Sequence, residues 1–143
     1  TPSSTVDRIF NVNFKGTFNC AKNAAKVMKK FKMGRIINFS TIAVPICLEG
    51  EAIYASSKSA VETFSKTFAK EIARYNITVN ILGPNPIRTD LIKGVDNQKL
   101  NNVIGMQTIK RFGTFNDVRN VIDFYLREES SMITGQKIYL GGL

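Results

Sequence analysis

Residues 77–82 read ITVNIL and residues 35–40 read RIINFS, and these two almost uniformly apolar runs decide the fold. A strand that is apolar along its whole length, not only at every second residue, is typical of a parallel sheet buried on both faces. The GPNP segment at 83–86 breaks the first run. A third strand is predicted from Gln136 to Leu140.

Helical patterns alternate with these strands. Apolar residues recur at helical spacing over residues 5–31, and a second helix is predicted over residues 52–75. Residues 89–113 are polar and irregular, and they predict a loop with short helical pieces. A last helix, capped by Asn116 or Asp117, is expected before the third strand. This order predicts an α/β fold, a doubly wound parallel sheet with three strands and flanking helices.

The composition limits the class of protein. The 143 residues, 43% of them hydrophobic, suffice for a single domain with a core, spanning 1–143. No run is long and apolar enough to cross a membrane, and residues 1–8 do not resemble a secretory signal. The two cysteines, Cys20 and Cys47, do not make a disulfide framework, so a reducing, cytoplasmic setting is expected. The absence of histidine excludes a histidine-based triad or a histidine-ligated metal, and no metal site is predicted.

A net charge of +9 raises the question of nucleic-acid binding. The lysines and arginines are spread along the chain, and most would fall on the solvated faces of the predicted helices. A solvated surface, or attraction for an anionic cofactor or an acidic carrier, is the favoured interpretation. Nucleic acid and membrane are therefore not expected partners.

Tyr54 and Lys58 lie four residues apart in the second predicted helix, so both project from one face. A free phenol has a pKa near 10, and a neighbouring ammonium lowers that pKa by stabilising the phenolate. The pair would then suit proton transfer at neutral pH. A surface lysine beside a half-buried tyrosine is the alternative interpretation of this spacing.

Two further polar residues occupy informative places. Thr41 directly follows the strand at 35–40, and ligands of parallel sheets bind at the carboxyl ends of strands. Asn13 lies on the inward stripe of the first helix, where an unpaired amide would cost about 1–3 kcal/mol. Asn13 would therefore bond a neighbouring backbone, or hold an ordered water beside an acid–base group.

Together these segments resemble the short-chain dehydrogenase/reductase family, over essentially the whole chain. The resemblance implies the C-terminal half of a Rossmann-like fold. The matching segments are the helix at 6–18 with Asn13, the strand and hydroxyl at 34–41, the Tyr54-x-x-x-Lys58 signature, Val79-Asn80, Pro84 to Thr89, and Thr134-Gly135-Gln136 with the closing Gly141-Gly142.

The resemblance implies a role for each matching residue. Tyr54 would exchange a proton with the substrate oxygen, and Lys58 would lower the pKa of Tyr54 and bind the nicotinamide ribose. Thr41 would hydrogen-bond the substrate oxygen, and Asn13 would hold the water of a proton relay. Around the nicotinamide, the resemblance places the turn at Pro84, the backbone of Ile87, and Thr89.

The family also implies partners. The cofactor would be NAD(P), with NADP slightly preferred, and the substrate a small carbonyl or alcohol, as in 3-oxoacyl-carrier-protein reductases. Such a substrate can be attached to a carrier protein. The helices at 5–31 and 52–75 would form the interface of a homodimer or homotetramer.

The sequence departs from the family pattern at three places. Thr41 stands where the family usually has serine, and Ser40 is expected to point the other way. Asn85 stands where the family prefers glycine, and asparagine tolerates a left-handed turn. The third departure is the nucleotide-binding half with its Gly-rich loop, which is absent from this chain. The strand at 35–40 would then be an open edge.

Two hypotheses follow. The first is an NAD(P)-dependent oxidoreductase that uses Tyr54 as general acid and base, with the isolated 143-residue piece inactive. The alternative is a catalytically silent or truncated scaffold or binding module of the same fold.

Overall fold

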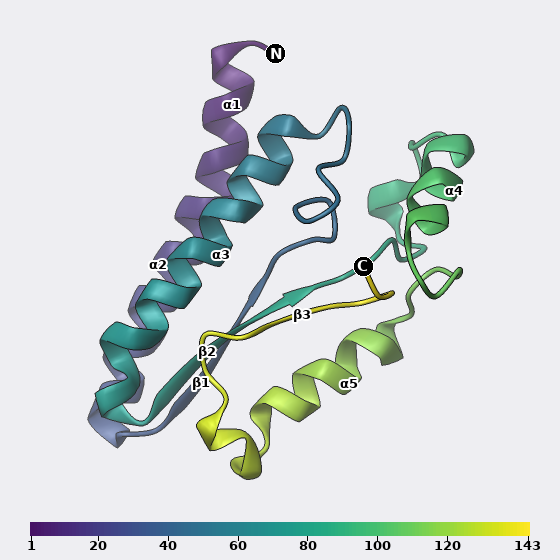
Figure 1. Cartoon of the computed structure of the whole chain (residues 1–143). Coiled ribbons are helices and arrows are strands. Elements are labelled where there is room, and N and C mark those ends of the chain that lie inside the picture. Colours follow the sequence, from purple (N-terminus) through teal and green to yellow (C-terminus); the bar gives the residue numbers. More distant parts are fainter.

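Three strands form one parallel sheet in the computed structural model, which describes residues 1–143 (Figure 1). They are β1 (Gly34–Phe39), β2 (Ile77–Gly83) and β3 (Lys137–Tyr139), in the order β1-β2-β3. β1 and β2 pair in register from Gly34 with Ile77 to Phe39 with Leu82. Every residue of β2 is buried, as its apolar sequence predicts for the central strand.

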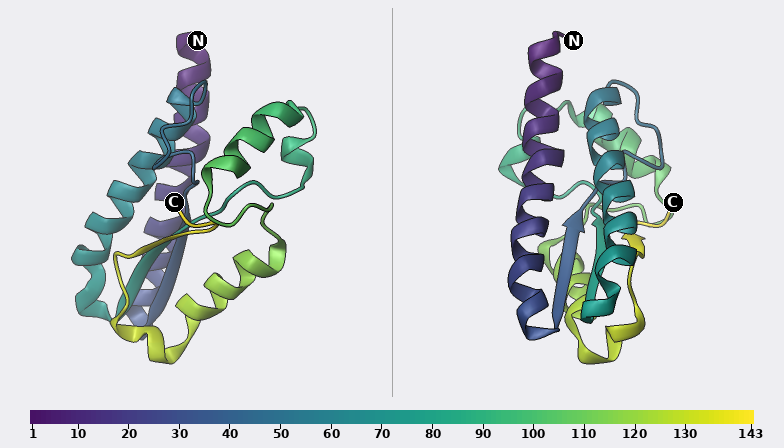
Figure 2. Two further views of the ribbon diagram at one scale, coloured as in Figure 1. Left: turned by 45° about the vertical axis from the view of Figure 1, so that its right-hand side comes forward. Right: turned by 90° about the vertical axis from the view of Figure 1, so that its left-hand side faces the viewer.

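Helices cover both faces of the sheet. α2 (Gly16–Phe31) and α3 (Ala52–Ile72) lie along one face, and α5 (Phe115–Leu126) lies on the other, whereas α1 (Ser3–Phe10) extends beyond the end of the strands beside α3 (Figures 1 and 2). One core cluster joins α2 and α3 to the sheet through Ala25, Ile72 and Val79, among others. A second cluster joins α5 to Leu82 through Val121 and Tyr125. The predicted doubly wound α/β fold is thus confirmed.

The first helix is not the continuous segment that residues 5–31 predict. A π-helical segment, Asn11–Lys15, separates α1 from α2. Such segments shift the hydrogen-bonding pattern by one residue and often occur at functional sites. The apolar periodicity continues across the segment, so the sequence pattern alone did not reveal it.

The segment between β2 and α5 is more ordered than the predicted loop at 89–113. It contains a short 3₁₀ turn at Asp90–Ile92 and a ten-residue helix, α4 (Asn97–Met106). The Asp96 side chain caps α4 by accepting a hydrogen bond from the Gln98 amide at 3.0 Å. The sequence analysis expected short helical pieces here but did not give the bounds of α4, because its polar residues show only weak periodicity.

The chain beyond α4 is held by the C-terminal end. The amides of Thr108 and Ile109 donate to the carbonyls of Gly142 and Gly141, each at 2.8 Å. Gly141 has a φ of +97°, which favours glycine, and a Cβ at this position would lie 2.8 Å from the Gln107 side chain. The closing glycines therefore shape the loop that follows α4.

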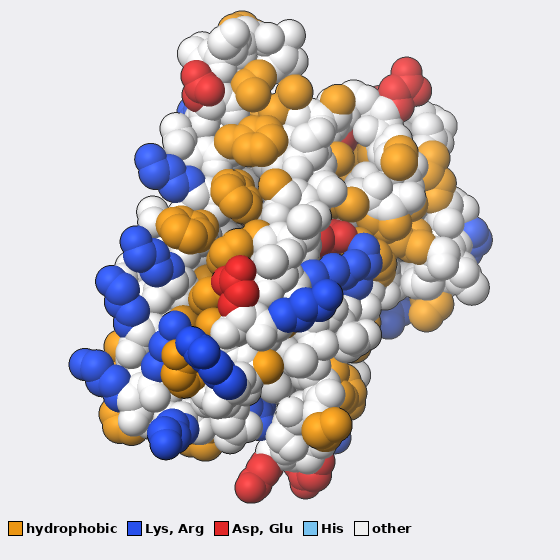
Figure 3. Space-filling view, turned by 60° about the vertical axis from the view of Figure 1, so that its left-hand side comes forward, with side chains coloured by type: hydrophobic (Ala, Val, Ile, Leu, Met, Phe, Trp, Pro, Cys, Tyr) orange, Lys and Arg blue, Asp and Glu red, His pale blue; other side chains and the backbone are white.

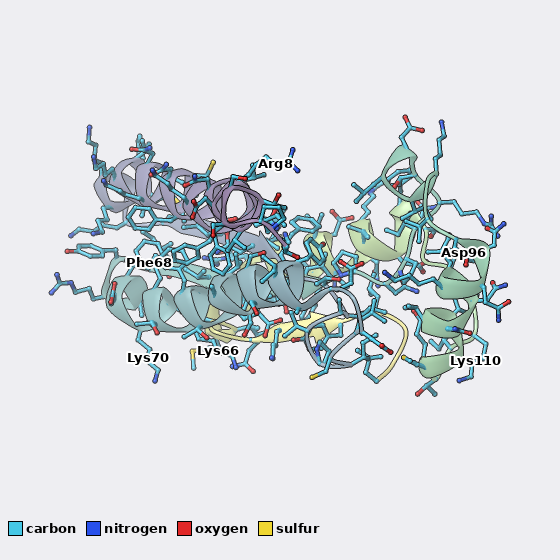
Figure 4. All side chains as sticks on the ribbon, turned by 90° about the horizontal axis from the view of Figure 1, so that it is seen from above. Arg8, Lys66, Phe68, Lys70, Asp96 and Lys110 are labelled. Carbon is cyan, nitrogen blue, oxygen red and sulfur yellow. The ribbon has the colours of Figure 1, made fainter.

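Surface charge follows the outer sides of the helices. Lys66 and Lys70 project from the side of α3 that faces away from α1 and α2, whereas Phe68 points between the helices (Figure 4). This arrangement agrees with the interpretation of the positive charge as a solvated surface. No helix combines the length and apolar character that crossing a bilayer requires.

The start of α5 depends on a capping box. Thr114, not Asn116 or Asp117 as expected, is the N-cap residue. Thr114 Oγ1 accepts from the Asp117 amide at 3.2 Å, and the Thr114 amide donates to Asp117 Oδ2 at 2.8 Å.

We predict that Thr114→Ala lowers the free energy of unfolding by about 0.5–2 kcal/mol, because the first turn of α5 loses its cap. Denaturant unfolding of the variant measures the change. Thr63→Ala, at an exposed position inside α3, is the control and should change stability little. An equal loss in both variants would contradict the role of the cap.

Candidate active site

The four residues singled out as catalytic gather at the carboxyl edge of the sheet. Thr41 follows β1, Tyr54 and Lys58 occupy the first two turns of α3, and Asn13 lies in the π-helical segment. Asn13 Nδ2 donates to Ser57 Oγ at 2.9 Å, and Ser57 Oγ donates to the Tyr54 carbonyl at 2.7 Å. The π-helical segment is thereby attached to the turn of α3 that carries the phenol.

Thr41 faces Tyr54. Thr41 Oγ1 accepts a hydrogen bond from the Ala43 amide at 3.2 Å. Its hydroxyl proton can be donated to the Tyr54 oxygen, an interaction that lowers the phenol pKa. Ser40, one residue earlier, is buried, and its hydroxyl donates to Glu62 two turns further along α3. The two neighbouring hydroxyls thus point to different places, as expected for consecutive residues at a strand end.

The pKa of Tyr54 lies above its ordinary value. Burial of the phenol raises the pKa, the hydrogen bond from Thr41 opposes this rise, and the nearby negative charge of Glu51 adds to it. Glu51 also accepts a hydrogen bond from Lys99 Nζ of α4 at 2.8 Å. This ion pair joins the start of α3 to α4.

Lys58 contacts the end of β1. Its Nζ donates to the carbonyl of Phe39 at the end of β1, at 3.1 Å. Burial lowers the pKa of Lys58 itself, because a charged ammonium is disfavoured away from water. The ammonium nevertheless stands one helical turn from the phenol, on the same side of α3.

A series of polar contacts, which the sequence analysis did not identify, docks α3 on the end of β1. Each of three successive turns of the helix contributes one contact. They are Lys58 Nζ to the Phe39 carbonyl at 3.1 Å, Ser40 Oγ to Glu62 Oε1 at 2.5 Å, and Asn38 Nδ2 to Ser65 Oγ at 2.8 Å. The even-numbered side chains of β1 face α3. The signal that could have revealed these contacts was Asn38, a polar residue inside an otherwise apolar strand.

The segment after β2 lies at the same edge. Pro84 accepts a hydrogen bond from the Ile42 amide at 3.2 Å, which ties this segment to the loop that follows Thr41. Ile87 forms a parallel bridge with Gly113, and Thr89 precedes the 3₁₀ turn at Asp90–Ile92. Of these three residues, Pro84 is the one that a backbone hydrogen bond joins to the loop after Thr41.

Asn85 does not use the left-handed conformation that its position suggested. It is absent from the residues with positive φ, and its side chain is 8% exposed. Asn85 Nδ2 donates to the Arg111 carbonyl at 3.2 Å, and a Cβ on Gly113 would lie 2.1 Å from Asn85 Oδ1. The asparagine holds residues 111–113 against the end of β2 instead of easing a turn.

The donors at this edge fit one end of a nicotinamide dinucleotide. A phenol, an ammonium and a hydroxyl, from Tyr54, Lys58 and Thr41, are the groups that hydrogen-bond ribose hydroxyls and a carbonyl oxygen. They lie where ligands bind in parallel α/β sheets, at the carboxyl ends of the strands.

Comparison with known proteins agrees with this geometry. A family model described as enoyl-(acyl carrier protein) reductase matches residues 1–142. The chain is 32% identical over 136 residues to 3-oxoacyl-(acyl-carrier-protein) reductase FabG of Staphylococcus epidermidis, covering 95% of this chain and 56% of that protein. It is 36% identical over 137 residues to the chloroplastic NADPH-dependent aldehyde reductase 2 of Arabidopsis thaliana, covering 95% and 50%. The chain thus spans about half the length of the curated relatives it matches.

A solved structure matches as well. The crystal structure of NAD⁺-bound xylitol dehydrogenase aligns with a TM-score of 0.88 and 26% identity, over 99% of this chain and 61% of that one. The family match, the relatives and the shared fold lead to one conclusion. The chain belongs to the short-chain dehydrogenase/reductase family of oxidoreductases and is similar to 3-oxoacyl-(acyl-carrier-protein) reductases.

Proposed function

We propose that the complete protein containing this chain is an NAD(P)-dependent oxidoreductase that interconverts a carbonyl and an alcohol. The observation that carries this proposal is the placement of Tyr54 and Lys58, in the first two turns of α3, beside the carboxyl end of the strand that leads into Thr41. Lys58 stands one turn from Tyr54, and Asn13 is joined to the same turn through Ser57. The bound dinucleotide would supply or accept the hydride.

Each side chain then has a separate task. Tyr54 donates its proton to the carbonyl oxygen during reduction and accepts it from the alcohol during oxidation. Thr41 holds the same oxygen by donating a hydrogen bond, and so fixes the direction of the carbonyl. Lys58 binds the ribose hydroxyls, and its positive charge beside the phenolate favours proton release from Tyr54.

The remaining assignments complete the site. Asn13 holds the water through which Tyr54 exchanges its proton with solvent. The turn at Pro84, the Ile87 backbone and the Thr89 hydroxyl receive the nicotinamide end of the cofactor. Their position after β2, at the edge that carries Tyr54, supports this placement.

The relatives support a carbonyl or alcohol substrate. Two named in the comparison are a 3-oxoacyl-(acyl-carrier-protein) reductase and an aldehyde reductase, and the latter is named as NADPH-dependent. We therefore favour NADP over NAD, and a substrate that can be attached to a carrier protein. The two exposed free cysteines, Cys20 and Cys47, fit a reducing cytoplasmic setting.

We further propose that the protein forms a homodimer or homotetramer through α1–α2 and α3, the helices predicted at 5–31 and 52–75. Hydrophobic side chains form a band along this face (Figure 3). Phe14, Phe18 and Phe68 each pack against Phe64, with ring centroids 5.2–6.1 Å apart. Phe18 remains 38% exposed and Val12 68% exposed, so apolar surface is available to a second copy.

We predict that Tyr54→Phe lowers kcat of the complete protein by about 10²–10⁴-fold, because the phenol proton is lost while the ring remains. NAD(P)H turnover with a panel of ketones, aldehydes and acyl thioesters measures the effect. Tyr75→Phe, at the far end of the α3 region, is the control and should keep full turnover. Retained turnover in Tyr54→Phe would exclude the assigned mechanism, and a protein that binds no NAD(P) by calorimetry would favour the silent scaffold.

We predict that Glu51→Gln shifts the titration of Tyr54 to lower pH. The carboxylate disfavours the phenolate, so removing its negative charge lowers the Tyr54 pKa. Phenolate absorbance, taken as the difference between each variant and its Tyr54→Phe counterpart, isolates this group. Glu49→Gln, an exposed neighbour that exerts no effect on Tyr54, should leave the titration unchanged. A titration that stays in place in Glu51→Gln contradicts the coupling.

We predict that Phe18→Lys weakens the assembly, because it places a charge within the apolar band. Sedimentation velocity measures the change as a fall in mass at equal protein concentration. Phe115→Lys, at an exposed phenylalanine on the opposite face of the sheet, is the control and should not change the mass. A monomeric parent protein, or an unchanged mass in Phe18→Lys, would rule out this interface.

A further inference from the structure

Glu62 is a buried carboxylate for which the proposed chemistry has no use. It lies on α3 one turn beyond Lys58, with its side chain 7% exposed. Glu62 Oε1 accepts hydrogen bonds from Ser40 Oγ and from the Tyr139 hydroxyl, both at 2.5 Å. Lys137 Nζ donates to Oε2 at 2.7 Å and to the Tyr139 hydroxyl at 3.0 Å. The carboxylate thus accepts hydrogen bonds from three donors, two of which, Lys137 and Tyr139, also contact each other.

This network keeps the carboxylate ionised. Burial raises the pKa of Glu62, but the hydrogen bonds from Lys137, Ser40 and Tyr139 outweigh it, so the pKa lies below its usual value. Lys137 in turn has a raised pKa because of its hydrogen bond to Glu62. At neutral pH the pair is therefore a carboxylate and an ammonium, and the charge-assisted bonds fix the side chain in one place.

The partners of Glu62 come from both edges of the sheet. Ser40 directly follows β1, whereas Lys137 and Tyr139 belong to β3. β2 lies between these strands. A single side chain of α3 therefore fastens the helix across the width of the sheet, at the carboxyl edge where the candidate site lies.

Ser40 connects this network to the site. Its amide donates to the Leu82 carbonyl at 2.8 Å, so backbone and side chain of Ser40 are both fixed. Thr41 is the next residue, so a shift of Ser40 is passed through one rigid peptide unit to the backbone of Thr41. On the helix, Glu62 stands two turns from Tyr54. The Glu62–Ser40 contact thereby sets the distance between the phenol and the Thr41 hydroxyl.

We propose that Glu62 is a positioning residue of the active site, which acts through Ser40 to hold Thr41 opposite Tyr54. The consequence for catalysis rests on the proposed function, whereas the placement of Thr41 does not. Loss of the contact misplaces a hydroxyl that must meet the substrate oxygen, and a displacement of about 1 Å at such a group can lower the rate by about 100-fold.

Kinetics of the complete protein test the proposal through three variants: Glu62→Gln, Ser40→Ala and the double variant. We expect Glu62→Gln and Ser40→Ala to lower kcat by about 10- to 100-fold while KM for the cofactor stays within about twofold. We expect the double variant to be no slower than the slower single variant, because both changes act on the same Glu62–Ser40 contact. Ser130→Ala removes a buried hydroxyl that donates to the Phe124 carbonyl far from the site, and it should lower stability without lowering kcat.

Hydrogen exchange provides a readout that does not require activity. In Glu62→Gln, the amides of residues 39–43 should exchange faster, whereas Ser130→Ala should leave them unchanged. If the parent protein turns over NAD(P)H but Glu62→Gln keeps kcat within twofold, the proposed function stands and the positioning role is overturned. If the parent protein shows no turnover, the proposed function fails and the exchange decides: unchanged amides at 39–43 would overturn the role of Glu62.

Discussion

Polar side chains buried between α3 and the sheet must find partners, and this requirement fixes where the helix can lie. Apolar packing between α3 and β2 is non-directional and would tolerate small shifts of the helix. Hydrogen bonds tolerate such shifts poorly. A buried side-chain amide such as that of Asn38 costs about 1–3 kcal/mol when it is left unpaired. Asn38 donates a hydrogen bond to Ser65, and Ser40 donates one to Glu62, at successive turns of α3. The position of the whole helix relative to β1 is therefore set by a few contacts.

The candidate site depends on that docking. Tyr54 and Lys58 belong to α3, whereas Thr41 belongs to the end of β1, so no local interaction holds the three groups together. Their separation follows from the way in which α3 rests on the sheet. The π-helical segment adds a second attachment, because Asn13 reaches Ser57 and through it the Tyr54 carbonyl. Helix, strand and π-helical segment thus converge on one turn of α3.

Much of this organisation follows from the sequence. Uniformly apolar runs predicted the parallel strands, and helical periodicity predicted the covering helices, because burial on one or both faces leaves a direct pattern along the chain. The same spacing placed Tyr54 and Lys58 on one side of a helix. The pattern did not predict the bounds of α4, the π-helical segment or the capping role of Thr114, since these depend on local hydrogen bonds that leave a weak periodic signal. Likewise, the buried role of Asn85 arises from its contact with Arg111, a residue 26 positions away.

By itself, the sequence determined the fold class, the order of the elements and which side chains are candidates for the site. These properties depend on periodicity and on the chemistry of single residues. Only the tertiary structure decided which groups meet: Lys58 with the Phe39 carbonyl, and Glu62 with donors from both β1 and β3. It also decided the electrostatics, raising the Tyr54 pKa through burial. The physical reason is that burial and pairing are properties of neighbours in space, and residues such as Glu62 and Lys137 are 75 positions apart in the chain.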